Sequence, residues 1–180
     1  MIYVFLSDGF EEIEALATVD ILRRAEIEVK TVGVGTKTPT GTHNIKVEAD
    51  ISETEATEEG LRGVVLPGGL PGAWNLKASK TVEKLTEYCF MNKRVVSAIC
   101  AAPAVLGDWG ILNGKKAICY PGFEDRLQGA EVVDAPAVTD GNIVTGKGAG
   151  TAIEFALAIV AVLKGENEAE KIKEAMQCSR

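Results

Sequence analysis

Cys100 is the residue whose surroundings most clearly indicate chemistry. It follows the apolar segment 95–99, which is typical of a buried strand, and it begins a segment that predicts a helix over 100–107. Small residues on both sides permit a tight strand-to-helix turn, the arrangement of a nucleophile elbow with sulfur in place of oxygen. Backbone N–H groups at the start of such a helix are expected to lower the pKa of the thiol. The alternative is that Cys100 is a small buried core residue.

A pair of glycines, Gly68 and Gly69, follows the apolar segment 63–66 and is the second candidate. Glycine has no β-carbon, so the backbone can approach a ligand closely at this point, and its N–H groups can face an anion. The pair therefore predicts an anion-binding turn, with a simple turn as the alternative.

Three carboxylates near the N-terminus, Glu11, Glu12 and Glu14, form the third candidate segment. Glu11 and Glu12 are expected to be solvated charges that suit the positive end of a helix dipole. Glu14 lies one residue beyond Ile13, close to the predicted apolar face of that helix. We expect Glu14 to point toward the edge of a sheet, where a carboxyl group can take part in chemistry.

The elements that must position these residues alternate along the chain. Residues 2–6 predict a strand, a helix begins at Glu11, and residues 28–34 predict a second strand, an order typical of a parallel sheet. The helix is expected to bury Ile13, Leu16, Ala17, Ile21 and Leu22. The other predicted elements are an edge strand or hairpin arm at 45–49, a short helix at 52–59, strands at 63–66 and 95–99, helices at 79–92, 148–163 and 166–176, and several short strands within 116–145.

We therefore expect an α/β fold in one domain over residues 1–180, a three-layer sandwich with a mostly parallel central sheet. In such sheets, ligands bind beyond the carboxyl ends of the strands. Segments 7–14, 66–72 and 99–103 all follow predicted strands, so their side chains and N–H groups are expected to meet at that edge.

Composition excludes several classes of protein. The chain has 19 basic and 26 acidic residues, a net charge of −7, and no run of Lys or Arg longer than two, so nucleic-acid binding is not expected. One histidine, His43, cannot supply a metal site of several histidines, and the four cysteines form no CxxC pair, so no metal site is expected. The cysteines are typical of reduced thiols in a cytoplasmic protein, and the N-terminal segment predicts neither a signal peptide nor a membrane span.

The glycine-rich segment that precedes the long helix at 148–163 does not have the spacing of a phosphate-binding loop. Gly33 and Gly35 do not form a dinucleotide fingerprint either, because no helix with a third glycine follows them. We expect no cofactor, and we expect Gly148 and Gly150 to allow close packing of the long helix on the sheet.

Five motifs occur in an informative order: Gly-Phe-Glu-Glu-Ile-Glu at 9–14, Val-Asp-Ile-Leu-Arg-Arg at 19–24, Leu-Pro-Gly-Gly at 66–69, Ala-Ile-Cys-Ala-Ala-Pro at 98–103 and Gly-Ala-Gly-Thr-Ala-Ile-Glu-Phe-Ala-Leu at 148–157. Together they resemble the ThiJ/PfpI superfamily, in the branch of the Parkinson-disease-linked protein deglycase and its bacterial ThiJ-like relatives. The resemblance spans nearly the whole chain. It implies a flavodoxin-like sandwich and a homodimer.

The resemblance also implies roles for individual residues. Cys100 matches the family's reactive cysteine, and Glu14 matches the acidic residue whose protonated carboxyl hydrogen-bonds the sulfur. Gly69 and Ala101 match the positions whose backbone N–H groups bind an oxyanion. His43 falls where the branch places a basic residue that reaches toward the partner subunit, although a surface histidine is the alternative from the residues alone.

Two departures from the family pattern concern catalysis. Tyr120 stands where many relatives have a histidine, and a phenol with an ordinary pKa of about 10 is a poor base that can still orient a substrate. Ala101 follows the cysteine where the protease-like branch has a histidine, so peptidase activity is not expected.

The resemblance implies a cysteine-dependent, cofactor-free protein of oxidative and carbonyl stress defence. Its substrates would be methylglyoxal-type 2-oxoaldehydes or the glycated proteins that they form, in a glyoxalase or deglycase reaction. The alternative is a non-enzymatic redox sensor or chaperone-like protein that acts through oxidation of Cys100 to sulfinic acid. A small-molecule binding module is a third, weaker interpretation.

Overall fold

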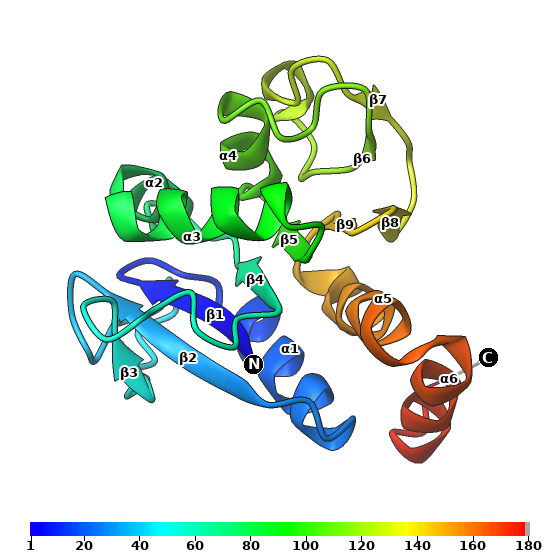
Figure 1. Ribbon diagram of the computed structural model, residues 1–180, viewed down its shortest axis with the longest axis horizontal. Coiled ribbons are helices and arrows are strands. Elements are labelled where there is room, and N and C mark those ends of the chain that lie inside the picture. Colours follow the sequence, from blue (N-terminus) through cyan, green and yellow to red (C-terminus); the bar gives the residue numbers. More distant parts are fainter. Residues whose placement is uncertain (179–180) are drawn as a thin grey trace.

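A computed structural model describes residues 1–178, whose strands form a seven-stranded sheet and a small two-stranded one (Figure 1). The large sheet has the order β3-β2-β1-β4-β5-β9-β8, and its neighbouring strands are parallel except β8 and β9. The predicted mostly parallel sheet is thereby confirmed. Its strands are β1 Ile2–Ser7, β2 Val29–Val34, β3 Ile51–Ser52, β4 Gly63–Leu66, β5 Val95–Ile99, β8 Ala137–Asp140 and β9 Ile143–Gly146, and the small sheet pairs β6 Lys116–Ala117 with β7 Glu131–Val132.

Helices cover both faces of the large sheet and complete the expected α/β sandwich (Figure 1). One face carries α2 Gly72–Ala78, α3 Lys80–Met91 and α4 Pro103–Asp108, and the other carries α1 Glu12–Arg24, α5 Ala152–Lys164 and α6 Glu166–Ala175. Two 3-10 turns, Glu124–Arg126 and Ala149–Thr151, connect other elements.

Strand β1 shows why the chain builds two cores. Alternate side chains of a strand point to opposite faces, and Tyr3 and Phe5 pack into one core whereas Ile2, Val4 and Leu6 pack into the other. A strand covered on both faces is apolar throughout, as this one is. This central strand holds the start of α1 in a fixed position beside β4.

Several local predictions are wrong. Residues 52–59 form no helix, because the Ser52 hydroxyl and N–H both donate to Glu55 Oε2, at 2.7 and 2.9 Å, and such local bonds compete with helix formation. Residues 45–49 form no edge strand but do form the alternative hairpin arm, because an antiparallel bridge joins Thr40 to Lys46 and the Val47 N–H donates to the Pro39 carbonyl at 3.1 Å. Helix α2 has no counterpart among the predictions, since Pro71 and Gly72 indicate a turn rather than a helix start.

The predictions for the later helices agree better with the structure. Helix α3, expected over 79–92, begins after Ser79, whose hydroxyl accepts the Val82 N–H at 3.3 Å and so caps the helix. Helix α5 begins at Ala152 rather than at residue 148, after the second 3-10 turn. Gly148 packs against the Tyr120 ring, and a β-carbon added to Gly150 would meet no atom within 4 Å, so close helix–sheet packing explains neither glycine.

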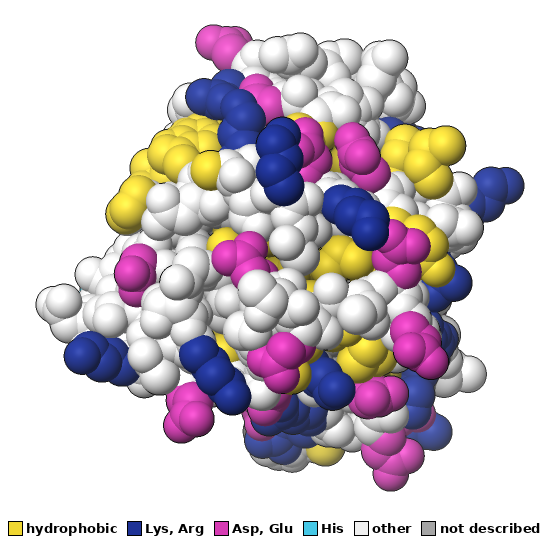
Figure 2. All heavy atoms as spheres, turned by 60° about the vertical axis from the view of Figure 1, so that its left-hand side comes forward, with side chains coloured by type: hydrophobic (Ala, Val, Ile, Leu, Met, Phe, Trp, Pro, Cys, Tyr) yellow, Lys and Arg dark blue, Asp and Glu magenta, His cyan; other side chains and the backbone are white. Residues whose placement is uncertain are grey.

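Acidic and basic side chains are interspersed over the face shown in Figure 2, and they form no continuous charged surface of one sign there. Within residues 1–178, no helix has the length and apolar character needed to cross a membrane.

Candidate active site

Cys100 occupies a strained turn at the end of β5. Its φ of +64° lies in the left-handed region, which costs a non-glycine residue about 1–3 kcal/mol unless the surroundings enforce it. The Cys100 N–H donates to the Gly146 carbonyl at 3.0 Å, and the Ala102 N–H donates to the Ile99 carbonyl at 3.1 Å. These bonds fix the turn, and the thiol remains partly exposed. The geometry is that of the expected elbow.

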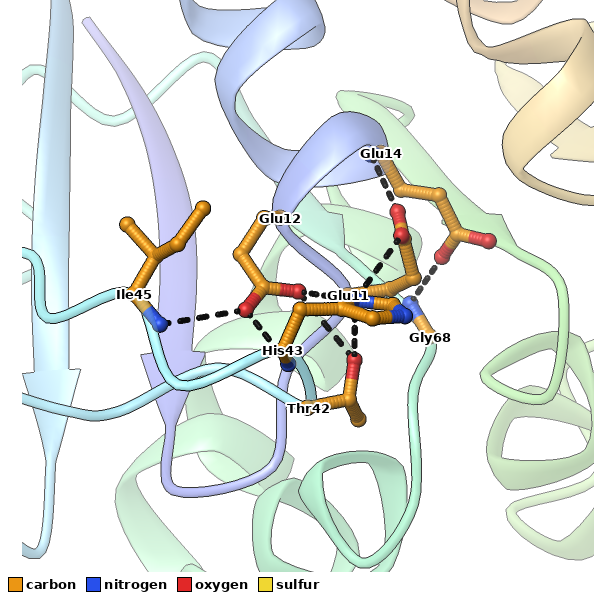
Figure 3. A network of polar contacts seen from close by, with 7 residues as sticks. All are labelled: Glu11, Glu12, Glu14, Thr42, His43, Ile45 and Gly68. Carbon is orange, nitrogen blue, oxygen red and sulfur yellow. Dashed lines mark hydrogen bonds and ion pairs between the residues drawn. The ribbon is translucent and has the colours of Figure 1, made fainter.

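Glu14 enters the same site from the first turn of α1 and is completely buried (Figure 3). The Glu11 side chain accepts the Glu14 N–H at 2.8 Å, which fixes the start of the helix. The Gly68 N–H donates to Glu14 Oε2 at 2.8 Å, whereas Oε1 makes no well-aligned hydrogen bond within residues 1–178. A buried carboxyl oxygen without a full partner is the feature expected of a group held for chemistry rather than for stability.

Two glycines allow the cysteine and the carboxyl to approach each other. A β-carbon on Gly68 would lie 2.6 Å from Cys100 Cβ and 2.7 Å from Glu14 Oε2, so no larger residue fits between them. Gly69 has a φ of +84°, and a β-carbon there would lie 2.4 Å from the Gly9 carbonyl oxygen. The Gly69 and Ala101 N–H groups lie close enough to the Cys100 sulfur to favour its ionised form.

The carboxyl and the thiol perturb each other's ionisation. Burial raises the pKa of the Glu14 carboxyl to about 7, while hydrogen bonding with Cys100 and Gly68 acts in the opposite direction. Burial and the Glu14 carboxylate raise the pKa of the Cys100 thiol to about 12, against the Gly69 and Ala101 N–H groups. Because two adjacent buried anions are costly, the pair retains one proton across the neutral range.

The expectation that a helix start lowers the pKa of Cys100 is therefore wrong for the thiol beside an ionised Glu14. The physical reason is local. Helix α4 starts at Pro103 rather than at Cys100 and has six residues, so its dipole is small and distant, whereas the carboxylate is adjacent. The thiolate forms readily only when the proton of the pair resides on Glu14.

Glu12 is also buried, contrary to the prediction that it is solvated. Its carboxylate accepts the His43 N–H at 2.7 Å, the Thr42 hydroxyl at 3.1 Å, the Ile45 N–H at 3.5 Å and a contact from His43 Nδ1 at 2.8 Å (Figure 3). These bonds lower the pKa of Glu12 to about 2 against the effect of its burial. Glu12 thus anchors the loop that carries His43, and no sequence signal marked it, because its partners lie about thirty residues away.

His43 is exposed, as the surface interpretation predicts, and the hydrogen bond that its ring donates to the Glu12 carboxylate raises its pKa. One ligand atom each from Glu11, Glu12 and His43 lies within 4.8 Å of the others. The Glu12 oxygens, however, already accept N–H and O–H groups of the protein, so the arrangement is a structural anchor.

Helix α1 buries only part of the side that was predicted. Two of the residues expected to be buried are fully buried, Ile21 and Leu22. Ile13 and Leu16, in contrast, are 58% and 37% exposed, whereas Glu14 and Thr18 are buried. The Thr18 hydroxyl donates to the Glu14 carbonyl at 2.7 Å, so it can be buried without losing a hydrogen bond. The buried side of α1 is therefore mostly apolar and also carries the Glu14 carboxyl.

Tyr120 lies beside the reactive turn, and its N–H donates to the Cys100 carbonyl at 2.8 Å. Its side chain is half exposed and packs near Gly148, where a β-carbon would lie 3.3 Å from the ring. The structure therefore brings Tyr120 next to Cys100 along the backbone and leaves its ring on the surface.

The sheet order and the strained cysteine at the end of β5 define an α/β protein with a nucleophile-elbow cysteine. The chain belongs to the DJ-1/PfpI family, whose model matches residues 1–162. The resemblance to the ThiJ/PfpI superfamily is thereby confirmed.

Known relatives share this assignment. The chain is 37% identical over 175 residues to the Parkinson disease protein 7 homolog of Danio rerio, covering 94% of this chain and 93% of that one. It is 38% identical over 171 residues to protein DJ-1 homolog A of Arabidopsis thaliana, covering 93% of this chain but 44% of that longer protein, so it spans less than half of it. A Caenorhabditis elegans relative, 29% identical over 164 residues, is named a glutathione-independent glyoxalase; the match covers 90% of this chain and 87% of that one.

Solved structures agree with the fold. A cysteine-to-alanine mutant of a DJ-1 superfamily protein from Salmonella typhimurium superimposes with a TM-score of 0.93 at 34% identity, covering 99% of this chain and 98% of that one. Toxoplasma gondii DJ-1 in a form described as oxidized gives a TM-score of 0.92 at 32% identity, with the same coverage.

Proposed function

We propose that this chain is a cysteine-dependent, cofactor-free enzyme of carbonyl stress defence that converts methylglyoxal-type 2-oxoaldehydes to 2-hydroxy acids. The observation that carries the proposal is the convergence of Cys100, Glu14 and the N–H groups of Gly69 and Ala101 at the end of β5. The naming of the worm relative as a glutathione-independent glyoxalase supports the same reaction class.

In the first step, the Cys100 thiolate attacks the aldehyde carbon while the proton of the pair resides on Glu14. A carbon–sulfur bond forms, and the carbonyl electron pair moves to oxygen to give a hemithioacetal oxyanion. The Gly69 and Ala101 N–H groups, which in the free protein favour the ionised sulfur, would stabilise this negative charge.

In the second step, Glu14 first gives its proton to the oxyanion and becomes a carboxylate. This carboxylate removes the proton from the former aldehyde carbon and returns it to the neighbouring ketone carbon through an enediol, while the hydroxyl proton of the hemithioacetal passes to the ketone oxygen. The former aldehyde carbon becomes a thioester and the ketone becomes an alcohol, so the oxidation and the reduction occur within one molecule. Water then hydrolyses the thioester and releases the hydroxy acid and the thiol. A carboxyl whose pKa is raised to about 7 can both donate and accept protons near neutrality.

Adducts that 2-oxoaldehydes form on proteins are the second proposed substrate, because the thiol is partly exposed at the surface. Peptide hydrolysis is not proposed. The histidine of this chain, His43, is bound to Glu12, and Ala101 follows the cysteine, so no Cys–His pair forms at the elbow.

The proposal is tested by measuring methylglyoxal consumption and lactate formation without glutathione for wild type, Cys100→Ser and Cys178→Ser. Cys178 is a matched control, since it is a partly exposed thiol outside the site. Cys100→Ser is expected to lose at least about 10³-fold in kcat/KM, whereas Cys178→Ser keeps the wild-type value. Equal turnover by Cys100→Ser and wild type would contradict the proposal.

A redox sensor is the second candidate function, and the oxidized form of the Toxoplasma relative supports it. One peroxide oxidises the Cys100 thiolate to sulfenate with release of water, and a second peroxide gives sulfinate. A protonated Glu14 would hydrogen-bond the sulfinate oxygens. Mass spectrometry after mild peroxide treatment is expected to show two added oxygens on Cys100 ahead of Cys89, Cys119 and Cys178, and equal oxidation of all four would exclude this function.

We further propose that the chain forms a homodimer in the cytoplasm, as the family resemblance and the four unpaired cysteines suggest. Ile13, Leu16 and Ile45 are 58%, 37% and 52% exposed, and they lie on α1 and on the loop that Glu12 anchors. Sedimentation of wild type and Ile13→Glu is expected to give a dimer and a monomer respectively, and a wild-type monomer would contradict the proposal.

A further inference from the structure

An ionic and aromatic cluster lies behind the reactive turn, on the face covered by α2 and α4. Asp108, at the end of α4, accepts Lys77 Nζ at 2.6 Å and is also bonded by the Arg126 guanidinium. Its side chain is 13% exposed, and the two cations lower its pKa. The pairing therefore takes place in a partly dehydrated environment, where it is stronger than an ordinary surface ion pair.

The same guanidinium lies over an aromatic ring. Arg126 Cζ is 4.6 Å from the centre of the Trp74 ring, and the Trp74 and Phe123 rings are 6.0 Å apart at 52°. A flat guanidinium can stack on an indole and bond a carboxylate at once, which lysine cannot do. We call the group of Trp74, Lys77, Asp108, Phe123 and Arg126 the Arg126 clamp.

The residues of the Arg126 clamp lie a short distance along the chain from the segments that build the reactive site. Asp108 ends the helix that follows Cys100. Trp74 lies in the first turn of α2, where the Ala73 N–H donates to the Gly69 carbonyl at 2.9 Å.

Arg126 is connected to the site along the chain. Its N–H donates to the Phe123 carbonyl at 3.0 Å, the Phe123 N–H donates to the Tyr120 carbonyl at 3.2 Å, and the Tyr120 N–H donates to Cys100. The Arg126 carbonyl also packs so closely on α4 that a β-carbon on Gly107 would lie 2.0 Å from its oxygen. Helix α2, helix α4 and the segment from Tyr120 to Arg126 are therefore held together at two places, at the reactive site and at the Arg126 clamp.

We propose that Arg126 is a positioning residue that holds the Gly69 N–H and the Tyr120 segment in register with Cys100. The argument is geometric: Arg126 lies in neither helix and contacts α2 through Trp74 and α4 through Asp108, so it ties the segment that follows Tyr120 to both. The Lys77–Asp108 ion pair joins the two helices directly, and without Arg126 it is the one clamp contact left between α2 and Asp108, so the turn that carries Gly69 is held less firmly relative to the sulfur. As the Gly69 N–H favours the thiolate, its displacement makes Cys100 harder to ionise. The effect on turnover rests on the proposed function, whereas the effect on the thiol does not.

The test measures the alkylation rate of Cys100 against pH, with mass spectrometry to identify the modified cysteine, in wild type, Arg126→Met, Arg126→Lys and Trp74→Leu. Methylglyoxal turnover and thermal unfolding are measured in parallel. Arg24→Met is the matched control, because Arg24 is also an exposed arginine, paired to Asp20 at 2.6 Å, but it lies at the far end of α1.

We expect Arg126→Met and Trp74→Leu to lower the Cys100 alkylation rate near neutrality by about tenfold, which corresponds to about one unit in the pKa of the thiol. Arg126→Lys is expected to restore the ion pair but not the stacking, and so to give an intermediate rate. Arg24→Met is expected to match wild type. If wild type fails to turn over methylglyoxal, the proposed function fails while the alkylation rates still decide the role of Arg126.

The proposal would be overturned if Arg126→Met and Trp74→Leu unfolded at a lower temperature but kept the wild-type pH profile of Cys100 alkylation. That result would mean that the clamp contributes to stability alone. If Arg126→Met does not fold, Trp74→Leu, which keeps both ion pairs of Asp108, supplies the same comparison. A wild-type profile in that variant also overturns the proposal.

Discussion

Glu12 and Glu14 lie two residues apart in the first turn of α1, both are buried, and their ionisation differs completely. Glu12 accepts bonds from a whole loop, and its pKa is lowered to about 2. Glu14 accepts one backbone N–H, and its pKa is raised to about 7. The two side chains have the same chemistry, so the difference arises from the deeper burial of Glu14 and from the larger number of donors that the fold directs at Glu12.

This difference separates a structural carboxylate from a reactive one. The carboxylate of Glu12 is saturated with donors and anchors the loop at 42–45. Glu14 has an oxygen without a well-aligned partner in the described part of the chain, and it faces a nucleophile. Burial alone does not mark an active carboxyl; burial with too few donors does.

The largest expected difference between the two residues is in catalysis. Glu14→Gln keeps the acceptor for the Gly68 N–H but cannot transfer a proton, so kcat/KM for methylglyoxal is expected to fall about 10²- to 10⁴-fold. Glu12→Gln is the matched control and is expected to keep the rate within about tenfold. Equal losses in the two variants would show that the two carboxyls do not differ in function.

The next effect is the pH dependence of stability. The folded Glu14 carboxyl has a pKa of about 7, above its ordinary value of 4.5, so its contribution is complete below pH 4.5 and is lost as the pH rises through 7. The loss amounts to about 3 kcal/mol in the free energy of unfolding. Urea unfolding across this window should show the decline in wild type and not in Glu14→Gln, and an unchanged slope in the variant would contradict the raised pKa.

Glu12 is expected to have the opposite dependence. Its folded pKa of about 2 lies below 4.5, so its contribution is present above pH 4.5 and is lost as the pH falls through 2. Glu12→Ala leaves partly buried N–H groups of the loop without their acceptor and should cost about 1 kcal/mol at pH 7. Urea unfolding at pH 7 provides the measurement, and a variant as stable as wild type would mean that the loop needs no anchor.

His43 gives the smallest expected effect, because its ring is exposed and its backbone N–H bonds Glu12 whatever the side chain. Its pKa is raised in the fold, so any stability that it adds is complete below pH 6.5 and disappears as the pH rises above its folded pKa. His43→Asn should therefore unfold earlier than wild type at pH 6 but not at pH 9, with a turnover rate within about threefold of wild type. A larger loss of turnover would place His43 in the catalytic site.

The sheet was predictable because strands buried on both faces are continuous apolar runs, as at 2–6, 63–66 and 95–99. Helix α2 was not, because Pro71 and Gly72 indicate a turn and no side chain caps its start. The turns after β3 were not either, because they depend on local bonds between Ser52 and Glu55. The exposed Ile13 and Leu16 were wrongly predicted to be buried, because the side of α1 that faces the sheet is the one that carries Glu14.

The site was partly predictable as well. Cys100 at the end of a strand and the glycine pair are local signals, and the structure places them together with Glu14. The role of Glu12 depends on a loop distant in sequence, and the raised pKa of Cys100 depends on the position of one carboxylate, so neither follows from spacing.

The central claim is that Glu14 and Cys100 share one proton, and the pH profile of Cys100 alkylation in wild type and Glu14→Gln tests it most directly. In wild type, the rate should level off above neutrality, because the pair holds its second proton toward pH 12. In Glu14→Gln, the carboxylate is absent but the thiol is still buried, so the rate should rise in a single step without a plateau above neutrality, at a pH below that of the second step of wild type. Superimposable single-step profiles in the two proteins would contradict the account.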